Sequence, residues 1–254
     1  MIIRGNRQLE ERYHRLSAGD VFIGRPLSGS LRLAVLIDLL EQGVHCLPPA
    51  LAQSLHYSKT AQAMTLKKWM LPHTKVIRRR TELIAAINDY SRHAIGAVVT
   101  QQEHMHCGHG VRRWENMEAL YNVVGFENSS YPFVLQPFQT GLSDVRVIIA
   151  GSYLEAYARS NPCGFRMNLA AGGHAEPYEL DKDEEAFCRA VIERGKFPYA
   201  HLDLQIVEGG ACFLSEIALD GGLKGAKIDR KRLDQEKKEI LEELARKIEA
   251  GHGR

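Results

Sequence analysis

Two acidic side chains near the carboxyl-terminal part of the chain could bind a metal ion. Asp203 and Glu216 each lie within a short apolar segment, and Glu208-Gly209-Gly210 separates the two segments. Alternating apolar and polar residues on either side of a glycine turn predict an antiparallel hairpin. Carboxylates on paired strands can bind Mg²⁺ through hard oxygen ligands, and Asp220 is a third oxygen donor within reach. The simpler interpretation is that these acids cover the wet face of a sheet.

A second group of residues combines arginines with polar residues and glycines. A guanidinium offers a planar fork to phosphate or carboxylate, and successive glycines let backbone amides approach an anion. Polar residues that alternate with apolar ones in an extended segment point to one side. The sequence therefore predicts an anion-binding group beside the acidic pair. Its members are Asp144, Arg146, Arg159, Arg166, Asn168, Gly172 and Gly173.

Helices and strands must position these side chains. Short strands at 20–24 and 44–47 flank the first helix in a β-α-β arrangement, and residues 144–156 form a hairpin that turns at Gly151-Ser152. Apolar residues surround the first helix, which is therefore expected to be buried, whereas the last helix is amphipathic. The fold class is α+β. Helices are expected at 31–42, at 59–70 with Ser58 as its N-cap, at 81–93, at 181–194 and at 229–250.

Composition narrows the classes of protein to consider. The 254 residues have the size of one large domain or two modest ones. A net charge of +2 supplies no overall field for nucleic acid or an acidic membrane. The longest apolar run is far below the roughly 20 residues that a membrane span needs. Five scattered cysteines suit a reducing cytoplasm. We expect a cytoplasmic globular protein that associates with neither membrane nor nucleic acid.

Taken in order, these motifs resemble the ATP-grasp carboxylate–amine ligases, in particular the branch that is RimK-like and glutathione-synthetase-like. The resemblance covers about residues 25–228. It implies an ATP-grasp fold over 58–250, in which a nucleotide cleft lies between a lobe at about 72–131 and a lobe at about 132–249. A shortened α/β domain at 1–57 would precede it. Hinge residues 134–138, Asp-x-Arg at 144–146 and Arg-x-Asn-Leu at 166–169 carry the resemblance.

The resemblance also implies roles for individual residues. ATP would first phosphorylate a carboxylate, and an amine would then displace phosphate to form an amide or peptide bond. The substrates would be an amino acid, a peptide or a protein tail, and the protein could form a homo-oligomer. The residues implied are Lys59, Gln136, Phe138 and Asp144 for ATP, Arg166 and Asn168 for its phosphates, Arg146 for the acyl phosphate or substrate carboxylate, and Asp203 and Glu216 with Asp220 for Mg²⁺ or Mn²⁺.

This sequence departs from the family pattern at several positions. The phosphate-contacting lysine is absent at Thr100 or Gln101, and Ala218 stands where the family has a metal-binding asparagine. A degenerate ATP-grasp protein, which binds nucleotide in a regulatory or scaffolding role, is therefore the alternative hypothesis. The segment that replaces the glycine-rich phosphate loop could act as a flexible lid or bind zinc. Its donor residues are His104, His106, Cys107 and His109.

Overall fold

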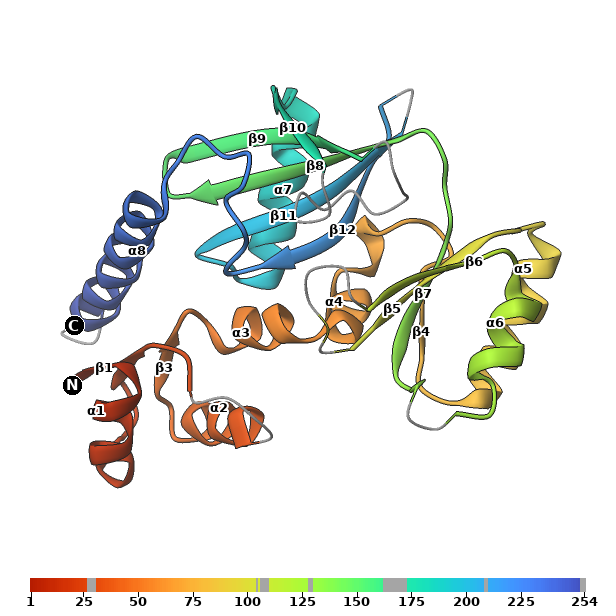
Figure 1. Cartoon of the computed structure of the whole chain (residues 1–254). Coiled ribbons are helices and arrows are strands. Elements are labelled where there is room, and N and C mark those ends of the chain that lie inside the picture. The colour runs from red at the N-terminus through yellow and green to blue at the C-terminus, as the bar shows by residue number, and fades with distance from the viewer. Residues whose placement is uncertain are drawn as a thin grey trace.

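The computed structural model describes residues 1–26, 31–103, 105, 110–127, 130–161, 173–207 and 210–251. Its strands form three sheets, and helices lie between and around them (Figure 1). This architecture is the expected α+β class. No helix within these ranges is both long enough and apolar enough to cross a lipid bilayer.

The first sheet is small and parallel, with strand order β1-β2-β3. Parallel neighbours need a crossover connection, which explains why a helix lies between successive strands. The β-α-β arrangement expected around the first predicted helix is confirmed. The elements are β1 (Ile2–Arg4), α1 (Gly5–Arg12), the 3₁₀ turn Tyr13–Arg15, β2 (Val21–Ile23), α2 (Leu31–Glu41) and β3 (His45–Leu47).

Helix α2 lies at the surface, so the prediction that it would be buried is wrong. Leu36 and Leu39 are buried, but Leu33, Ile37 and Leu40 are 57%, 50% and 52% exposed. The physical reason is that, among the described residues, α2 packs mainly against β3 and α3 (Ala50–Tyr57), which cover one side of the helix. An apolar residue can remain exposed where no neighbouring element covers it, so composition alone overestimated burial.

The second sheet is antiparallel, with strand order β4-β7-β5-β6. Strand β7 (Phe133–Pro137) pairs with both β4 and β5, and all five of its residues are buried. Residues from 132 onward were expected in the other lobe, whereas this strand lies in the same sheet as β4, β5 and β6. The other elements here are β4 (Lys75–Ile77), α5 (Arg80–Arg92), β5 (Val98–Gln102), β6 (Val111–Trp114) and α6 (Met117–Val124).

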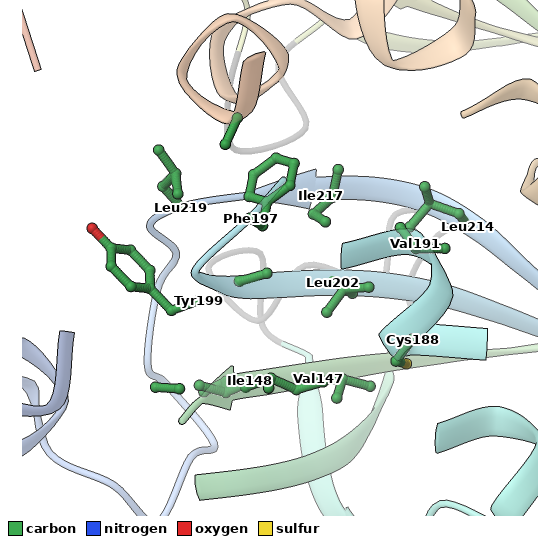
Figure 2. Close-up of a cluster of buried hydrophobic side chains, with 14 of the residues drawn as sticks. Val147, Ile148, Cys188, Val191, Phe197, Tyr199, Leu202, Leu214, Ile217 and Leu219 are labelled. Carbon is green, nitrogen blue, oxygen red and sulfur yellow. The ribbon is translucent and has the colours of Figure 1, made fainter. Parts of the chain in front are cut away.

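The third sheet has five antiparallel strands in the order β10-β9-β8-β11-β12. Both predicted hairpins are present, as β8 with β9 and as β11 with β12. Figure 2 shows Cys188 and Val191 of α7 against Leu202 and Leu214 of this sheet, in the largest apolar core. The elements are β8 (Leu142–Ala150), β9 (Tyr153–Ser160), β10 (His174–Tyr178), α7 (Lys182–Gly195), β11 (Tyr199–Val207) and β12 (Cys212–Ala218).

Three further helices join the sheets. In α4 (Lys59–Thr65), the expected N-cap is confirmed, because the Ser58 side chain accepts a hydrogen bond from the Ala61 amide. This helix ends at Thr65 rather than at 70. The predicted amphipathic last helix packs against β2, β3 and β8. These elements are α3 (Ala50–Tyr57), α4 (Lys59–Thr65), the 3₁₀ turn Lys67–Trp69 and α8 (Arg230–Gly251).

The start of α7 provides a test of local stability. Asp181 accepts a hydrogen bond from the Glu184 amide at 2.8 Å, and the Glu184 carboxylate accepts one from the Asp181 amide at 3.0 Å. Because this capping box satisfies two free amides, Asp181→Ala is expected to lower the free energy of unfolding by about 1 kcal/mol. Asp181→Asn keeps the acceptor and is expected to stay near wild type in urea titrations. Equal losses in both variants would contradict the capping role.

Candidate functional site

A cavity of about 850 Å³ lies between the four-stranded and five-stranded sheets. Gln101 and Gln136 line it from the four-stranded sheet, and Arg146 and Asp203 line it from the five-stranded sheet. Lys59, at the start of α4, forms another part of the wall. The volume of this cavity lies within the range typical of small-molecule sites. Residues predicted from widely separated motifs therefore face one space.

Acidic and basic side chains form a row across the strands that line this cavity, and strand pairing places them side by side. Arg146 on β8 lies opposite Asp203 on β11, and Asp203 lies opposite Glu216 on β12. On the other side of β8, Asp144 lies opposite Arg159 on β9. Residues opposite one another in a sheet are close neighbours, so strand register positions this group. The ladder shifts register directly after Asp203, an irregularity common next to active sites.

Two arginines and two aspartates form a largely buried ion-pair network. The Arg146 guanidinium donates hydrogen bonds to both oxygens of Asp203 at 2.7 Å. Arg159 pairs with Asp144 and lies 3.1 Å from Asp203. Burial opposes ionisation of Asp203, but the two guanidinium groups hold the pKa of its carboxyl well below the usual range. Burial, with a contribution from the negative charge of Asp203, raises the pKa of Asp144.

Lys59 is fixed beside Glu216 by α4. The Lys59 ammonium donates a hydrogen bond to Glu216 at 2.8 Å, and this lysine side chain is 11% exposed. One turn further along α4, Gln62 bonds to both backbone groups of Ile217, accepting from its amide at 3.0 Å and donating to its carbonyl at 2.9 Å. These buried bonds hold β12 against the helix. The predicted nucleotide-binding lysine and metal-binding glutamate are therefore neighbours.

Asp220, the third predicted metal ligand, uses its carboxylate in ion pairs with two basic side chains. Its carboxylate contacts Arg25 at 2.7 Å and Lys237 at 2.8 Å. Burial acts against its ionisation, but Lys237 and Arg25 lower the pKa of Asp220 to about 2. Across the described ranges, Asp203, Glu216 and Asp220 are not a group of three whose ligand atoms all lie within 4.8 Å of one another. Paired register and donor chemistry at Asp203 and Glu216 fit a divalent cation.

The predicted hinge residues use their polar groups within the sheet. The Gln136 side chain is buried, donates to the Thr74 hydroxyl at 3.2 Å and accepts from the Gln101 amide at 2.8 Å. The Phe138 amide donates to the Ala97 carbonyl at 2.9 Å. Both residues line the cavity. Gln101, at one of the two positions considered for the missing lysine, also faces the cavity, whereas the hydroxyl of Thr100 accepts a hydrogen bond from Trp114.

Several predicted residues lie outside the described ranges. Arg166 and Asn168, expected to face the phosphates, are among them, as is Gly172. The donors of the histidine-rich segment, including Cys107, also lie outside. The structure therefore brings together Lys59 and the ion-pair network, with the hinge residues on the opposite wall of the cavity.

His201 is a cavity residue that the sequence analysis missed. Its side chain lies two positions before Asp203 on β11, opposite Ala218 on β12. It is only 3% exposed, and neither ring nitrogen has a hydrogen-bond partner among the described residues. A Cβ atom at Gly221 would lie 2.7 Å from Nδ1, so a glycine is needed beside the ring. The two-residue spacing from Asp203 was the available signal, because alternate residues of a strand share a face.

His201 is expected to make the folded protein sensitive to mild acid. Burial, with positive charge on Lys237 and Arg146, lowers the pKa of His201 to about 3, although Asp203 and Asp220 act in the opposite direction. Between the unfolded value of 6.5 and this folded value, the unfolded chain binds more protons. The free energy of unfolding therefore falls as pH drops below 6.5. In urea titrations, His201→Asn should show a smaller fall than wild type; identical pH slopes would contradict this assignment.

Comparisons with known proteins agree with this architecture. The RimK-like ATP-grasp domain model matches residues 57–248, and no curated protein matches the chain. D-cycloserine synthetase DcsG superposes with a TM-score of 0.62 at 16% identity, over 93% of this chain and 85% of that chain. D-alanine-D-alanine ligase from Coxiella burnetii gives 0.64 at 10% identity, over 93% and 72%.

A third similar structure is the ATP-grasp ligase PsnB, complexed with a phosphomimetic variant of its minimal precursor, Mg and ADP. It has a TM-score of 0.59 at 15% identity, over 87% of this chain and 77% of that chain. At such identities, the structural likeness concerns the fold, while the domain match covers most of the sequence. The chain belongs to the RimK-like ATP-grasp family.

Proposed function

We propose that this protein is an ATP-dependent ligase that joins a carboxylate to an amine. The observation that carries the proposal is the Arg146–Asp203–Glu216 row, which faces the cavity together with Lys59. A cavity between two sheets can hold a nucleotide on one side and an acceptor on the other. Within this group, Arg146 and Lys59 supply fixed positive charge where phosphoryl groups and carboxylates would lie, and Asp203 and Glu216 hold those two side chains in position.

The proposed reaction has two steps. A carboxylate oxygen attacks the γ-phosphorus of ATP, the bond to the bridging oxygen breaks, and an acyl phosphate and ADP form. The amine nitrogen then attacks the acyl carbon, inorganic phosphate leaves, and the nitrogen loses a proton to form the amide. Phosphoryl transfer of this type depends mainly on positioning and charge stabilisation.

Individual side chains have distinct roles in this proposal. Lys59 and Arg146 contact the negatively charged groups, Asp144 faces the ribose, and Asp203 and Glu216 would hold Mg²⁺, which neutralises phosphate charge when it is bound. These acids are paired with basic side chains, so we infer that metal and nucleotide bind together. His201 remains neutral and offers one donor and one acceptor to the bound acceptor substrate.

Trapping of the acyl phosphate tests the proposal without knowledge of the amine. Hydroxylamine attacks acyl phosphates and gives hydroxamates, so it can replace the natural amine. The purified chain would be incubated with ATP, Mg²⁺, hydroxylamine and panels of amino acids, short peptides and acidic peptides. ATP-dependent hydroxamate formation, matched by ADP formation, is expected with one class of carboxylate. Binding of ATP without hydroxamate from any panel would instead favour the second candidate.

That second candidate is a protein that binds nucleotide without ligation. Two observations favour it: the uncharged Gln101 faces the cavity, and Ala218 lies opposite His201 without offering an oxygen ligand. The site nevertheless retains the paired acids and both arginines, which a purely scaffolding role would not require. Nucleotide binding detected by calorimetry, with no ATP consumption under any condition above, is the result that this candidate predicts.

A further inference from the structure

A cluster of potential metal ligands lies outside the cavity, where the segment before β4 meets the end of α5. It consists of His73, Asp89 and His93, and one ligand atom from each lies within 4.8 Å of the others. The two imidazole rings are 4.3 Å apart between centroids, at an angle of 52°. None of the cavity residues belongs to this cluster.

We propose that His73, Asp89 and His93 form a binding site for a divalent transition-metal ion, with Zn²⁺ as its occupant. Two imidazoles and a carboxylate are the donor types that zinc accepts with three protein ligands and one open position. Zinc bonds of 2.0–2.2 Å place neighbouring ligand atoms of a tetrahedral site about 3.4 Å apart. Small side-chain rotations would close the cluster to that spacing.

A backbone hydrogen bond fixes which nitrogen of His93 is able to bind a metal. Its Nδ1 lies 2.8 Å from the Asp89 carbonyl oxygen, which can only accept a hydrogen bond. Nδ1 must therefore carry the proton, and in the neutral ring the lone pair lies on Nε2. Metal-binding histidines commonly donate their other nitrogen to a carbonyl in this way, which fixes the tautomer and the ring orientation.

His73 is held in place by its backbone. It has a φ of 62°, in the left-handed region, and its carbonyl accepts a hydrogen bond from the buried Tyr90 hydroxyl at 2.8 Å. Tyr90 lies on α5 between Asp89 and His93, so one helical turn anchors all three donors. A metal ion here would tie the segment before β4 to the carboxyl-terminal turn of α5.

The Asp89 carboxylate is ionised and oriented. A hydrogen bond from Lys75, with further positive charge nearby, lowers the pKa of Asp89. One oxygen lies 2.8 Å from the Lys75 ammonium, and the other lies 3.6 Å from Nδ1 of His93. Lys75 thus holds one oxygen, and the second, which also accepts a hydrogen bond from Arg92 at 3.4 Å, would exchange that exposed contact for the metal. Positive charge on Lys75 and Arg92 weakens cation binding, so we expect zinc rather than the more weakly bound Mg²⁺.

Direct metal titration of the full chain tests this site. Zn²⁺ would be added to chelator-treated protein in a calorimeter, and Co²⁺ would serve as a spectroscopic substitute. His73→Asn and His93→Asn are each expected to weaken the binding event at least about tenfold. Asparagine tolerates both the left-handed φ at 73 and the helix end at 93, so both variants should fold. His14→Asn removes an exposed histidine on the first 3₁₀ turn and serves as the matched control.

The Co²⁺ spectrum separates this site from the histidine-rich segment that contains Cys107. A site of two imidazoles and a carboxylate gives visible bands without thiolate-to-metal charge transfer. Wild-type and His14→Asn proteins should show these bands, and the two test variants should lose them. The proposal is overturned if wild type binds no Zn²⁺, if all three variants bind it equally, or if the bound ion shows a thiolate band.

Discussion

Replacement of Arg146 by lysine is expected to lower ATP-dependent hydroxamate formation by about 10²- to 10³-fold. The Arg146 guanidinium spans both oxygens of Asp203 and also lies 3.4 Å from the Gly222 carbonyl. Lysine keeps the charge but loses the planar fork, so it cannot maintain both Asp203 contacts in one geometry. The rate constant would be measured at saturating ATP with the carboxylate that the hydroxylamine screen identifies.

Nucleotide affinity should change much less than turnover in this variant. Lys59 and the opposite wall of the cavity remain intact, so we expect less than about a tenfold change in the Kd of a non-hydrolysable ATP analogue. Arg189→Lys is the matched control, because Arg189 is exposed on α7, away from the cavity lining, and pairs with Glu185 one turn away. Unchanged turnover in Arg146→Lys would show that this guanidinium does not contact the reacting groups.

The second large effect is expected from Asp203→Asn. This substitution keeps the side-chain shape but removes a buried charge that compensates Arg146 and Arg159. Breaking a buried pair of this type is expected to lower the free energy of unfolding by roughly 3 kcal/mol, which urea titration would measure. The increase in ATP affinity that we expect from Mg²⁺ should be lost, because one of the two proposed carboxylate ligands is gone.

Titrations with ATP in the absence of Mg²⁺ test separately what the negative charge of Asp203 does to nucleotide binding. Without Mg²⁺, ATP should bind Asp203→Asn at least as tightly as wild type, since the cavity has become more positive. Asp220→Asn is the matched control: the Asp220 carboxylate is already paired with Arg25 and Lys237, so the Mg²⁺ effect should persist. If Mg²⁺ fails to increase ATP affinity in both variants, Asp220 is also a metal ligand. If Mg²⁺ still increases ATP affinity in Asp203→Asn, the metal assignment is refuted.

Local patterns predicted the two hairpins that carry Asp144, Arg146, Asp203 and Glu216. Alternation of apolar and polar residues around a glycine turn is a short-range signal, so each hairpin could be inferred from about fifteen residues. The pairing of β8 with β11 could not, because Arg146 and Asp203 are 57 positions apart and neither local pattern specifies the partner strand. The ion-pair network therefore became visible only in the structure.

Burial and side-chain partners were the other features that sequence patterns missed. The apolar composition of α2 gave no sign that only one face would be covered. Gln62 was an unremarked polar residue in a predicted helix, although its amide holds Ile217 across 155 positions. His201 belongs to no sequence motif that would mark it as a cavity residue. In each case, the decisive neighbour comes from a distant part of the chain, which local propensity does not encode.

The contact between Gln62 and Ile217 also bears on self-association. Strand β12 is one edge of the five-stranded sheet, and an unpaired edge can template pairing with another chain. By engaging both backbone groups of Ile217, the Gln62 amide occupies positions that a foreign strand would need. At the opposite edge, β10 contains Pro177, which has no amide hydrogen to donate. Ile217 and Pro177 therefore each oppose the pairing of a foreign strand at one edge of the sheet that carries the proposed ligand site.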